Sequence, residues 1–331
     1  MSEETRVIAY GLGPIGSAIA RLVAQRSGLR LVGGVDIDPA KVGRDIGEVI
    51  GLGRPLGPAV RQKLADVLTD TEADVALLAT SSYMDLFAPQ IHECLDADLD
   101  VVSTCEELAF PWLTYPKEAA QIDAAAKRAH RTVLGTGINP GFLMDSLPLY
   151  LTAICQKVEH VEVRRVINAS TRRQPFQAKI GSGLTVQEFQ ARIDAGRMGH
   201  VGLRESVGMV MDTLGRELVR FETAVEPIAA EQRVKTAYFD VQPGKVIGLK
   251  QEAHAYEEKG EFMALIFLAA LDTPEERDTI RITGTPNLVV TLEGTNGDLA
   301  TTAIAVNAIP RVCRAAPGLM TMRDLPPLTA W

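Results

Sequence analysis

The sequence predicts an α/β protein: a Rossmann-type parallel sheet, a second α+β domain with a mixed sheet, and a C-terminal helix that packs back on the first domain. Three observations carry this prediction. Up to about residue 140, short apolar strand patterns alternate with helical patterns, as in a sheet covered by helices on both faces. A glycine-rich turn follows the first strand pattern directly. After residue 145, closely spaced strand patterns follow helical ones, which is typical of an antiparallel or mixed sheet.

The first domain is expected to span residues 1–145. Its predicted strands are apolar on both faces and cover residues 6–10, 29–35, 75–79, 101–104 and 132–134. Between them, Ile15–Val23 places apolar residues on one helical face. Ser82 with Asp85 resembles a capping box at the start of another helix, and Pro116 is placed to open a third.

The rest of the chain is expected to form a substrate and dimerisation domain, residues 146–298, and a returning helix with its tail, residues 299–331. Strands are predicted at residues 161–168, 253–256, 262–271, 279–283 and 288–292. Helices are predicted at residues 186–195, 203–214 and 299–313.

Composition excludes several classes of protein. The 331 residues are 46% hydrophobic and 23% charged, which is ordinary globular usage. The formal net charge is −8 and no run of Lys or Arg forms a stripe, so nucleic acid and membrane surfaces are not expected partners. No apolar run is long enough to cross a bilayer.

Cysteine usage and the N-terminal residues predict a cytoplasmic location. The segment MSEETRVIAYGLG is acidic and soon enters a strand pattern, so no signal peptide is expected. The cysteines form no CxxC pair, and no metal-binding motif such as HExxH is present, so no metal is implied. They stand far apart, at Cys94, Cys105, Cys155 and Cys313.

The motif Gly11-Leu12-Gly13-Pro14-Ile15-Gly16 predicts a dinucleotide site. It leaves a strand pattern and opens a helix, which is the context that dinucleotide-binding motifs require. Gly11 would permit the tight turn, Gly13 the approach of a pyrophosphate, and Gly16 close helix–strand packing. Asp36 ends the next strand, twenty residues after Gly16, where it can accept the ribose hydroxyls.

Asp36 favours NAD(H) as the cofactor, because a carboxylate at this position disfavours a 2′-phosphate. NADP(H) is the second candidate, since Lys41 and Arg44 follow closely and could meet that phosphate. A plain βαβ turn with a solvated aspartate is the alternative without a ligand.

Three further loops leave strands at the same rim of the predicted sheet. The first, residues 79–82, contains small and hydroxyl side chains expected to line the cofactor, although a helix cap alone explains them nearly as well. The second, residues 101–107, brings a thiol and two carboxylates, for which a solvated N-terminal turn is the alternative. The third, residues 135–142, carries glycines that let the backbone pass close to a flat ring. The residues assigned to cofactor binding here are Ala79, Thr80, Ser81, Ser82, Thr104, Cys105, Asn139 and Pro140.

Five segments together resemble the 2,4-diaminopentanoate dehydrogenase family, which includes the native amine dehydrogenases. They are GLGPIG (11–16), VDIDP (35–39), STCEELAFPW (103–112), GTGINPGF (135–142) and GHVGLRESVGM (199–209). The resemblance spans most of the chain. It implies a Rossmann domain and an α+β domain, a homodimer, and an active site in the cleft between the two domains.

The reaction that this resemblance implies is reversible NAD(P)-dependent oxidative deamination of a primary amine, or reductive amination of a ketone or aldehyde with ammonia. It also implies a catalytic glutamate at the STCEE segment. Glu106 and Glu107 both stand there, and we favour Glu106. The chain lacks the His-His pair and SGT loop of true dihydrodipicolinate reductases, so that activity is not expected.

Weaker signals concern the substrate and the returning helix. Phe142, Met144 and Phe176 would suit a small aliphatic chain, and His200 is a further pocket candidate, although a buried or capping histidine is more common. Asn307 could return to the nicotinamide, or it could stand on the polar face of its helix.

Two rival functions stay open. An acylating aldehyde dehydrogenase would use Cys105 as its nucleophile, but neighbouring carboxylates disfavour a thiolate. A non-enzymatic nucleotide-sensing protein could use the same fold.

Overall fold

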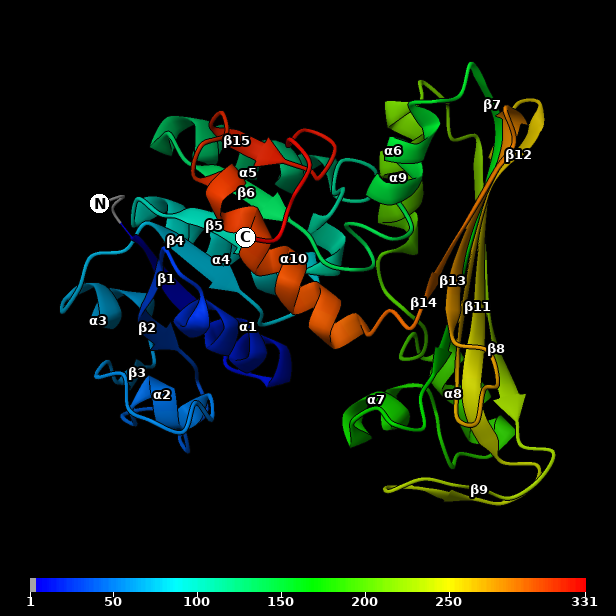
Figure 1. The fold of residues 1–331 in the computed structure, drawn as a ribbon, viewed down its shortest axis with the longest axis horizontal. Coiled ribbons are helices and arrows are strands. Elements are labelled where there is room, and N and C mark those ends of the chain that lie inside the picture. The colour runs from blue at the N-terminus through cyan, green and yellow to red at the C-terminus, as the bar shows by residue number, and fades with distance from the viewer. Residues whose placement is uncertain (1–3) are drawn as a thin grey trace. The chain divides into compact units, whose positions relative to one another are not determined.

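The computed structural model describes residues 4–331 and divides the chain into two compact units. The first unit holds the residues up to Ser146 together with Asn296–Trp331, and the second holds Leu147–Thr295. Because the returning segment belongs to the first unit, the C-terminal helix packs against the sheet that the chain forms first (Figure 1).

The first unit is built on a seven-stranded parallel sheet in the order β15-β6-β5-β4-β1-β2-β3. This arrangement contains the 3-2-1-4-5-6 order of a Rossmann sheet, with one strand added at the β6 edge. The strands are β1 (Thr5–Tyr10), β2 (Leu29–Val35), β3 (Val60–Arg61), β4 (Val75–Leu78), β5 (Asp100–Ser103), β6 (Thr132–Gly135) and β15 (Gly318–Met320).

Helices cover both faces of this sheet, so that its central strands are buried on two sides. On one face, α1 (Pro14–Gln25) lies beside α10 (Gly297–Val312), and their apolar side chains form one core with the strands (Figure 1). On the other, α4 (Met84–Asp96) and α5 (Pro116–Ala129) form a second core. The short elements of this unit are α2 (Ile46–Val49), α3 (Leu64–Leu68) and the 3₁₀ turn η1 (Glu106–Leu108). Helix α6 (Ser146–Thr152) belongs to the second unit except for its first residue.

The second unit is a six-stranded mixed sheet in the order β14-β13-β7-β12-β11-β8. Only β7 and β12 pair in parallel, and the other neighbours are antiparallel. The strands are β7 (Lys157–Asn168), β8 (Arg220–Ala229), β11 (Val246–Glu257), β12 (Gly260–Ala270), β13 (Arg277–Thr285) and β14 (Leu288–Glu293).

The second unit also contains α7 (Gln174–Lys179), α8 (Val186–Asp194) and α9 (Leu203–Thr213) (Figure 1). Helix α8 contacts β8, and α9 contacts β11. A two-stranded ribbon joins β9 (Val234–Lys235) to β10 (Asp240–Val241). The predicted fold class, a Rossmann-type sheet with an α+β unit and a returning helix, is confirmed.

One local prediction is wrong. Helix α4 begins at Met84, and its N-cap residue is Tyr83, so Ser82 and Asp85 do not form a capping box. The cap comes instead from a residue far along the chain, Glu107. Among residues 4–331, no helix is both long enough and apolar enough to span a bilayer.

Candidate dinucleotide site and carboxylate turn

The glycine turn between β1 and α1 has the steric properties that its motif predicts. Gly11 has φ +89°, and a Cβ there would stand 2.8 Å from the Ala79 carbonyl oxygen. A Cβ on Gly16 would stand 1.8 Å from the Gly11 oxygen, so only glycine lets α1 approach β1 this closely. Around Gly13, by contrast, no heavy atom of the described residues beyond its own chain neighbours lies within 4 Å of the Cβ position.

Helix α1 therefore opens onto a space shaped for an anion. Gly13 is its N-cap and has no side chain with which to cap the first N–H groups, and Pro14 occupies the first turn. The unsatisfied N–H groups and the positive end of the helix dipole favour a phosphate at such a terminus. The open space above Gly13 leaves room for that group to reach the backbone, which is the fit a dinucleotide pyrophosphate requires.

Asp36 is buried directly after β2. Its hydrogen bonds connect the glycine turn with the loop that follows β2. Its Oδ2 accepts hydrogen bonds from the Leu12 backbone N–H at 2.8 Å and from Lys41 Nζ at 2.9 Å. Its Oδ1 accepts one from the Asp38 N–H at 2.8 Å. Burial alone would raise the pKa of Asp36, but these hydrogen bonds outweigh it and lower the pKa, so the residue is anionic at neutral pH.

The residues after β4 make local hydrogen bonds at the same rim. Thr80 Oγ1 donates to Gln90 Oε1 at 2.5 Å, and Ser81 Oγ accepts from the Tyr83 N–H at 3.1 Å. The Ser82 carbonyl oxygen accepts from the Glu107 N–H at 3.4 Å. The structure thus brings the loop after β4 against the loop after β5.

The two acidic residues after β5 stand on the single turn η1 but have different surroundings. Glu107 Oε2 accepts a hydrogen bond from the Met84 N–H at 2.6 Å and so caps α4. Glu106 precedes it at the start of the turn and is half-buried. The Glu107 carboxylate therefore caps a helix, and the catalytic role of Glu106 stays a prediction.

Cys105 is a buried thiol, with 1% of its surface exposed. Burial is the largest cause that raises its pKa, and the neighbouring Glu106 carboxylate raises it further. Both effects disfavour the thiolate that a cysteine nucleophile needs.

Glycines hold η1 close to the loop that leaves β6. A Cβ on Gly135 would stand 2.5 Å from the Leu108 carbonyl oxygen, so this strand end packs directly against the carboxylate turn. Gly141 has φ +121°, and its N–H donates to Asp145 Oδ2 at 2.7 Å. The Asn139–Pro140 peptide between them is cis.

Some buried side-chain oxygens of the first unit have no hydrogen-bond partner among the described residues. Among the described residues, Thr136 Oγ1 and Asn307 Oδ1 are inaccessible to solvent and make no hydrogen bond. Thr136 follows β6 and Asn307 lies on α10. Buried polar atoms are nearly always hydrogen-bonded in native proteins, so a bound group that supplies donors at these positions is expected.

The four residues predicted for the substrate pocket are divided between the units. Phe142 is half-buried against the core of the first unit, and Met144 is fully buried there. In the second unit, Phe176 lies under the Arg172 guanidinium, and the His200 ring stacks on Phe267 with centroids 4.8 Å apart. Their contribution to substrate binding stays a prediction.

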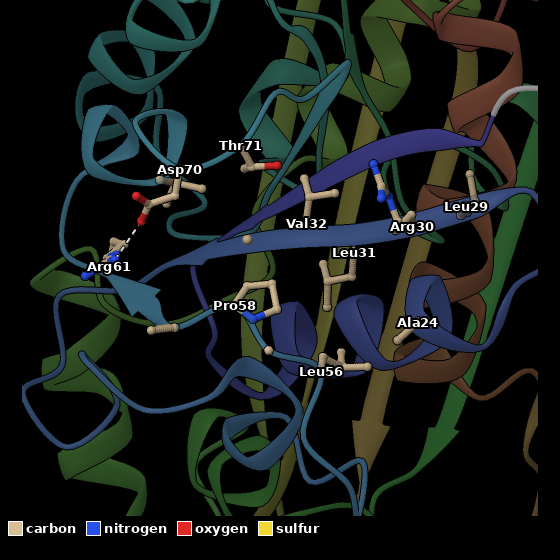
Figure 2. Close-up of a pocket in the computed structure, with 14 residues that line it drawn as sticks. Ala24, Leu29, Arg30, Leu31, Val32, Leu56, Pro58, Arg61, Asp70 and Thr71 are labelled. Atoms are coloured by element: carbon tan, nitrogen blue, oxygen red, sulfur yellow. Dashed lines mark hydrogen bonds and ion pairs between the residues drawn. The ribbon is translucent and has the colours of Figure 1, made fainter.

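A cavity of about 560 Å³ lies elsewhere in the first unit, along the edge of β2 (Figure 2). Because β3 pairs only with the last residues of β2, the earlier part of this strand borders the cavity. Arg61 and Asp70 form an ion pair at one end of it. None of the residues predicted for the cofactor or the substrate lines this cavity.

Sequence reasoning missed three features of the site. They are the ion pair of Lys41 with Asp36, the capping of α4 by Glu107, and the support of the Gly141 turn by Asp145. Asp36 and Lys41 are only five positions apart in the segment VDIDPAK, so the sequence could have indicated their ion pair. The other two depend on how neighbouring loops meet.

A glycine turn fitted to a pyrophosphate, an acidic residue at the end of β2, and loops from β4, β5 and β6 at one rim define the class of dinucleotide-binding dehydrogenases. Residues 5–104 match the family "Dihydrodipicolinate reductase, N-terminus", and residues 142–331 match the family "2,4-diaminopentanoate dehydrogenase C-terminal domain". The chain belongs to the 2,4-diaminopentanoate dehydrogenase family.

Similar proteins extend over nearly the whole chain. The chain is 32% identical to a 2,4-diaminopentanoate dehydrogenase of Acetoanaerobium sticklandii, over 98% of this chain and 94% of that one. It is 24% identical to an amine dehydrogenase of Streptomyces virginiae, over 96% and 95%. The solved structure of an amine dehydrogenase from Mycobacterium smegmatis matches with a TM-score of 0.88 and 27% identity, over 100% and 98%.

Proposed function

We propose that this protein is an NAD(P)-dependent amine dehydrogenase, which interconverts a small primary amine with the corresponding ketone or aldehyde and ammonia. The observation that carries the proposal is the half-buried Glu106 on a turn at the rim where dinucleotides bind. Full-length similarity to a 2,4-diaminopentanoate dehydrogenase and an amine dehydrogenase supports it.

The residues of the first unit would hold the cofactor in a fixed orientation. The N-terminus of α1 at Gly13 would bind the pyrophosphate, and Asp36 would accept hydrogen bonds from a ribose. Thr136 and Asn307 would meet polar groups of the cofactor through their unpartnered oxygens. When bound, the nicotinamide supplies or accepts the hydride, a chemistry that belongs to the cofactor.

Glu106 would act on the amine. An anionic side chain favours an ammonium or iminium cation close to it, and a positioned carboxylate can take and return the protons of amine–carbonyl exchange. In the reductive direction, ammonia adds to the carbonyl carbon and water leaves. A group must therefore take a proton from the nitrogen and give a proton to the oxygen that departs as water. Glu106 Oε would serve as that acid and base.

Buried Cys105 argues against the rival acylating mechanism. An acyl-enzyme needs an accessible thiolate with a base or positive charge beside it. Burial and the neighbouring Glu106 raise the pKa of this thiol instead.

The cofactor preference and the assembly are finer proposals. Asp36 supports NAD(H) as one accepted cofactor, because a carboxylate directly after β2 can accept the hydroxyls of a ribose. A homodimer is proposed from the family resemblance. Phe267 and the His200 ring stacked on it lie on one face of the second sheet, so its neighbours in the strand, Ile266 and Leu268, place apolar side chains on the opposite face. Size-exclusion chromatography with light scattering measures the assembly.

Consumption of NADH and NADPH with ammonia and a panel of small ketones and aldehydes tests the activity. We expect turnover that requires both ammonia and the carbonyl compound, and NAD(P)+ reduction by the corresponding amine. Glu106→Gln should lose this turnover while still binding NADH. If the wild-type protein binds NADH but reduces no carbonyl compound with ammonia, the nucleotide-sensing alternative is favoured.

A further inference from the structure

The cavity along β2 points to a second binding site: we propose that the outer edge of this strand pairs with an extended peptide of a partner protein, in which apolar and acidic residues alternate. In the sheet, β3 pairs only with Gly34 and Val35 at the end of β2. The outer edge of residues 29–33 therefore has no neighbouring strand among the described residues. This site is separate from the dinucleotide site, because none of its lining residues belongs to the glycine turn or to the loops that follow β4, β5 and β6.

The segment that precedes β3 is held away from β2 by hydrogen bonds to the region of α2. The Ile46 N–H donates to the Pro58 carbonyl oxygen at 2.9 Å. Asp45 Oδ2 accepts a hydrogen bond from the Gly57 N–H at 2.7 Å. Because this segment is bound there and not to β2, a cavity of about 560 Å³ remains between it and the strand (Figure 2).

The cavity opens to solvent and has the length of a short strand. Arg30, Gly57 and Asp70 line it and are exposed. At about 3.3 Å per residue, residues 29–33 extend over roughly 13 Å, which is enough to pair with a strand of about five residues. An unpaired strand edge presents N–H donors and C=O acceptors in alternation, and a second extended backbone is the ligand that satisfies such a row.

The two sides of this edge differ in chemistry. Leu29 and Leu31 belong to the core beside α1, whereas Val32 belongs to the core on the opposite face of the sheet. Arg30 stands between the two leucines, so it lies on the Val32 side. Figure 2 shows the apolar wall on the Leu31 side, which is formed by Ala24, Leu31, Leu56 and Pro58.

An added strand also places alternate side chains on opposite faces. Its apolar residues would therefore contact the wall beside Leu31, and the residues between them would face Arg30. This geometry is what favours a peptide with a regular alternation over one that is apolar throughout.

Arg30 makes acidic side chains the favoured partners on its side. It is exposed, and among the described residues its guanidinium has no ion pair or hydrogen bond. The cavity's other arginine, Arg61, is already paired with Asp70 at 2.7 Å. Opposite charges on neighbouring strands attract and like charges repel, so Arg30 disfavours a basic strand at this edge and favours an acidic one.

Fluorescence anisotropy tests the proposal on the full-length protein with a dye-labelled peptide of alternating valine and glutamate, capped at both ends. It should bind about tenfold or more tightly than the matching peptide of valine and lysine, because an attractive cross-strand pair replaces a repulsive one. Equal affinities for the two peptides would overturn the proposal.

N-methylated peptides test whether the backbone takes part. The N–H groups of alternate residues face opposite sides of a strand. Of two valine–glutamate peptides, one methylated at every valine nitrogen and one at every glutamate nitrogen, one should therefore lose its affinity and the other should keep it. Equal affinities of the two methylated peptides would refute strand pairing.

Protein variants locate the site. Arg30→Glu should raise the dissociation constant of the valine–glutamate peptide about tenfold, and Arg30→Lys should keep it close to wild type. Arg128, an exposed arginine of α5 that does not line the cavity, is the matched control, and Arg128→Glu should leave the constant nearly unchanged. An equal loss in Arg30→Glu and Arg128→Glu would overturn the assignment.

Hydrogen exchange gives a readout that general attraction between charges does not move. The bound peptide should slow exchange of the backbone amides within residues 29–33, since new hydrogen bonds form there. Binding without such protection would place the peptide elsewhere and refute the proposal. Because no amine, ketone or dinucleotide enters these measurements, failure of the proposed amine reaction leaves their outcome unaffected.

Discussion

The Glu107 carboxylate accepts a hydrogen bond from the Met84 backbone N–H at 2.6 Å, so one of two adjacent acids caps a helix that begins far away in the sequence. Helix N-termini leave unsatisfied N–H groups and attract negative charge. The contact gives Glu107 a structural task and separates it from Glu106.

Substitution of Glu106 should therefore lower mainly the turnover rate, and substitution of Glu107 mainly the stability. Glu106→Gln should lower kcat about 10²–10⁴-fold, the usual contribution of a positioned acid or base. Glu107→Ala should lower the free energy of unfolding by about 0.5–2 kcal/mol through the lost cap, with a milder loss of kcat. Thermal unfolding and steady-state kinetics on both variants measure the two effects.

The reverse result, a dead Glu107 variant beside an active Glu106 variant, would move the catalytic role by one residue. Wild-type rates in both variants would refute carboxylate catalysis altogether.

Cys105→Ser should keep substantial activity. The thiol is buried and its pKa is raised by burial and by Glu106, and both effects disfavour a nucleophilic thiolate. Alkylation of native Cys105 should accordingly be slow compared with alkylation after unfolding, which peptide mass spectrometry of the labelled protein measures. A folded, NADH-binding Cys105→Ser variant without any turnover would instead favour the acyl-enzyme reaction.

The features that the sequence predicts well are those set by neighbours in the chain. The glycine turn and the position of Asp36 directly after β2 follow from spacing within one βαβ unit, whereas the ion pair of Asp36 with Lys41 was not predicted. Long apolar strands such as β2 are also evident from their pattern.

The features that the sequence does not predict depend on distant partners or on weak patterns. β8 is an edge strand whose side chains are mostly exposed or half-buried, so its pattern has little apolar contrast. β3 and β15 are two and three residues long, and they are strands only because a neighbour pairs with them. The choice between Glu106 and Glu107 likewise depends on where α4 begins.

Acid should weaken the loop that carries Lys41 through Asp45, at the loop's far end. Asp45 accepts hydrogen bonds from the N–H groups of Gly47 and Gly57 at 2.7 Å and of Leu56 at 3.0 Å. Burial would raise its pKa, but these backbone donors outweigh burial and lower it. A lowered pKa means that the carboxylate stabilises the fold above the unfolded pKa, about 3.9, and that this stability is lost as pH falls through the folded pKa.

Asp45→Asn should therefore be less stable than wild type at pH 7, and the difference should shrink as pH falls below about 4. Denaturant unfolding of both proteins between pH 7 and pH 3 measures it. A difference that stays constant over this range would mean that the charge of Asp45 is not what stabilises the loop.

An added methyl group should lower stability at Gly16 but lower only cofactor affinity at Gly13, although both glycines belong to one motif. At Gly16 an added Cβ would stand 1.8 Å from the Gly11 carbonyl oxygen, which forces α1 away from β1. Gly16→Ala should be strongly destabilised, with a Tm lowered by several degrees or more.

At Gly13 the backbone, with φ −67° and ψ −174°, is one that alanine adopts freely. Among the described residues, nothing beyond its own chain neighbours lies within 4 Å of the new methyl group. Gly13→Ala should therefore fold with a Tm close to wild type. The methyl group would stand in the space that a pyrophosphate needs, so the dissociation constant for NADH should rise about tenfold or more, the effect of losing at least one hydrogen bond to a charged group. Calorimetric unfolding and NADH titration of the two variants separate the outcomes. A stable Gly13→Ala variant that binds NADH as tightly as wild type would show that the pyrophosphate does not approach the backbone at Gly13.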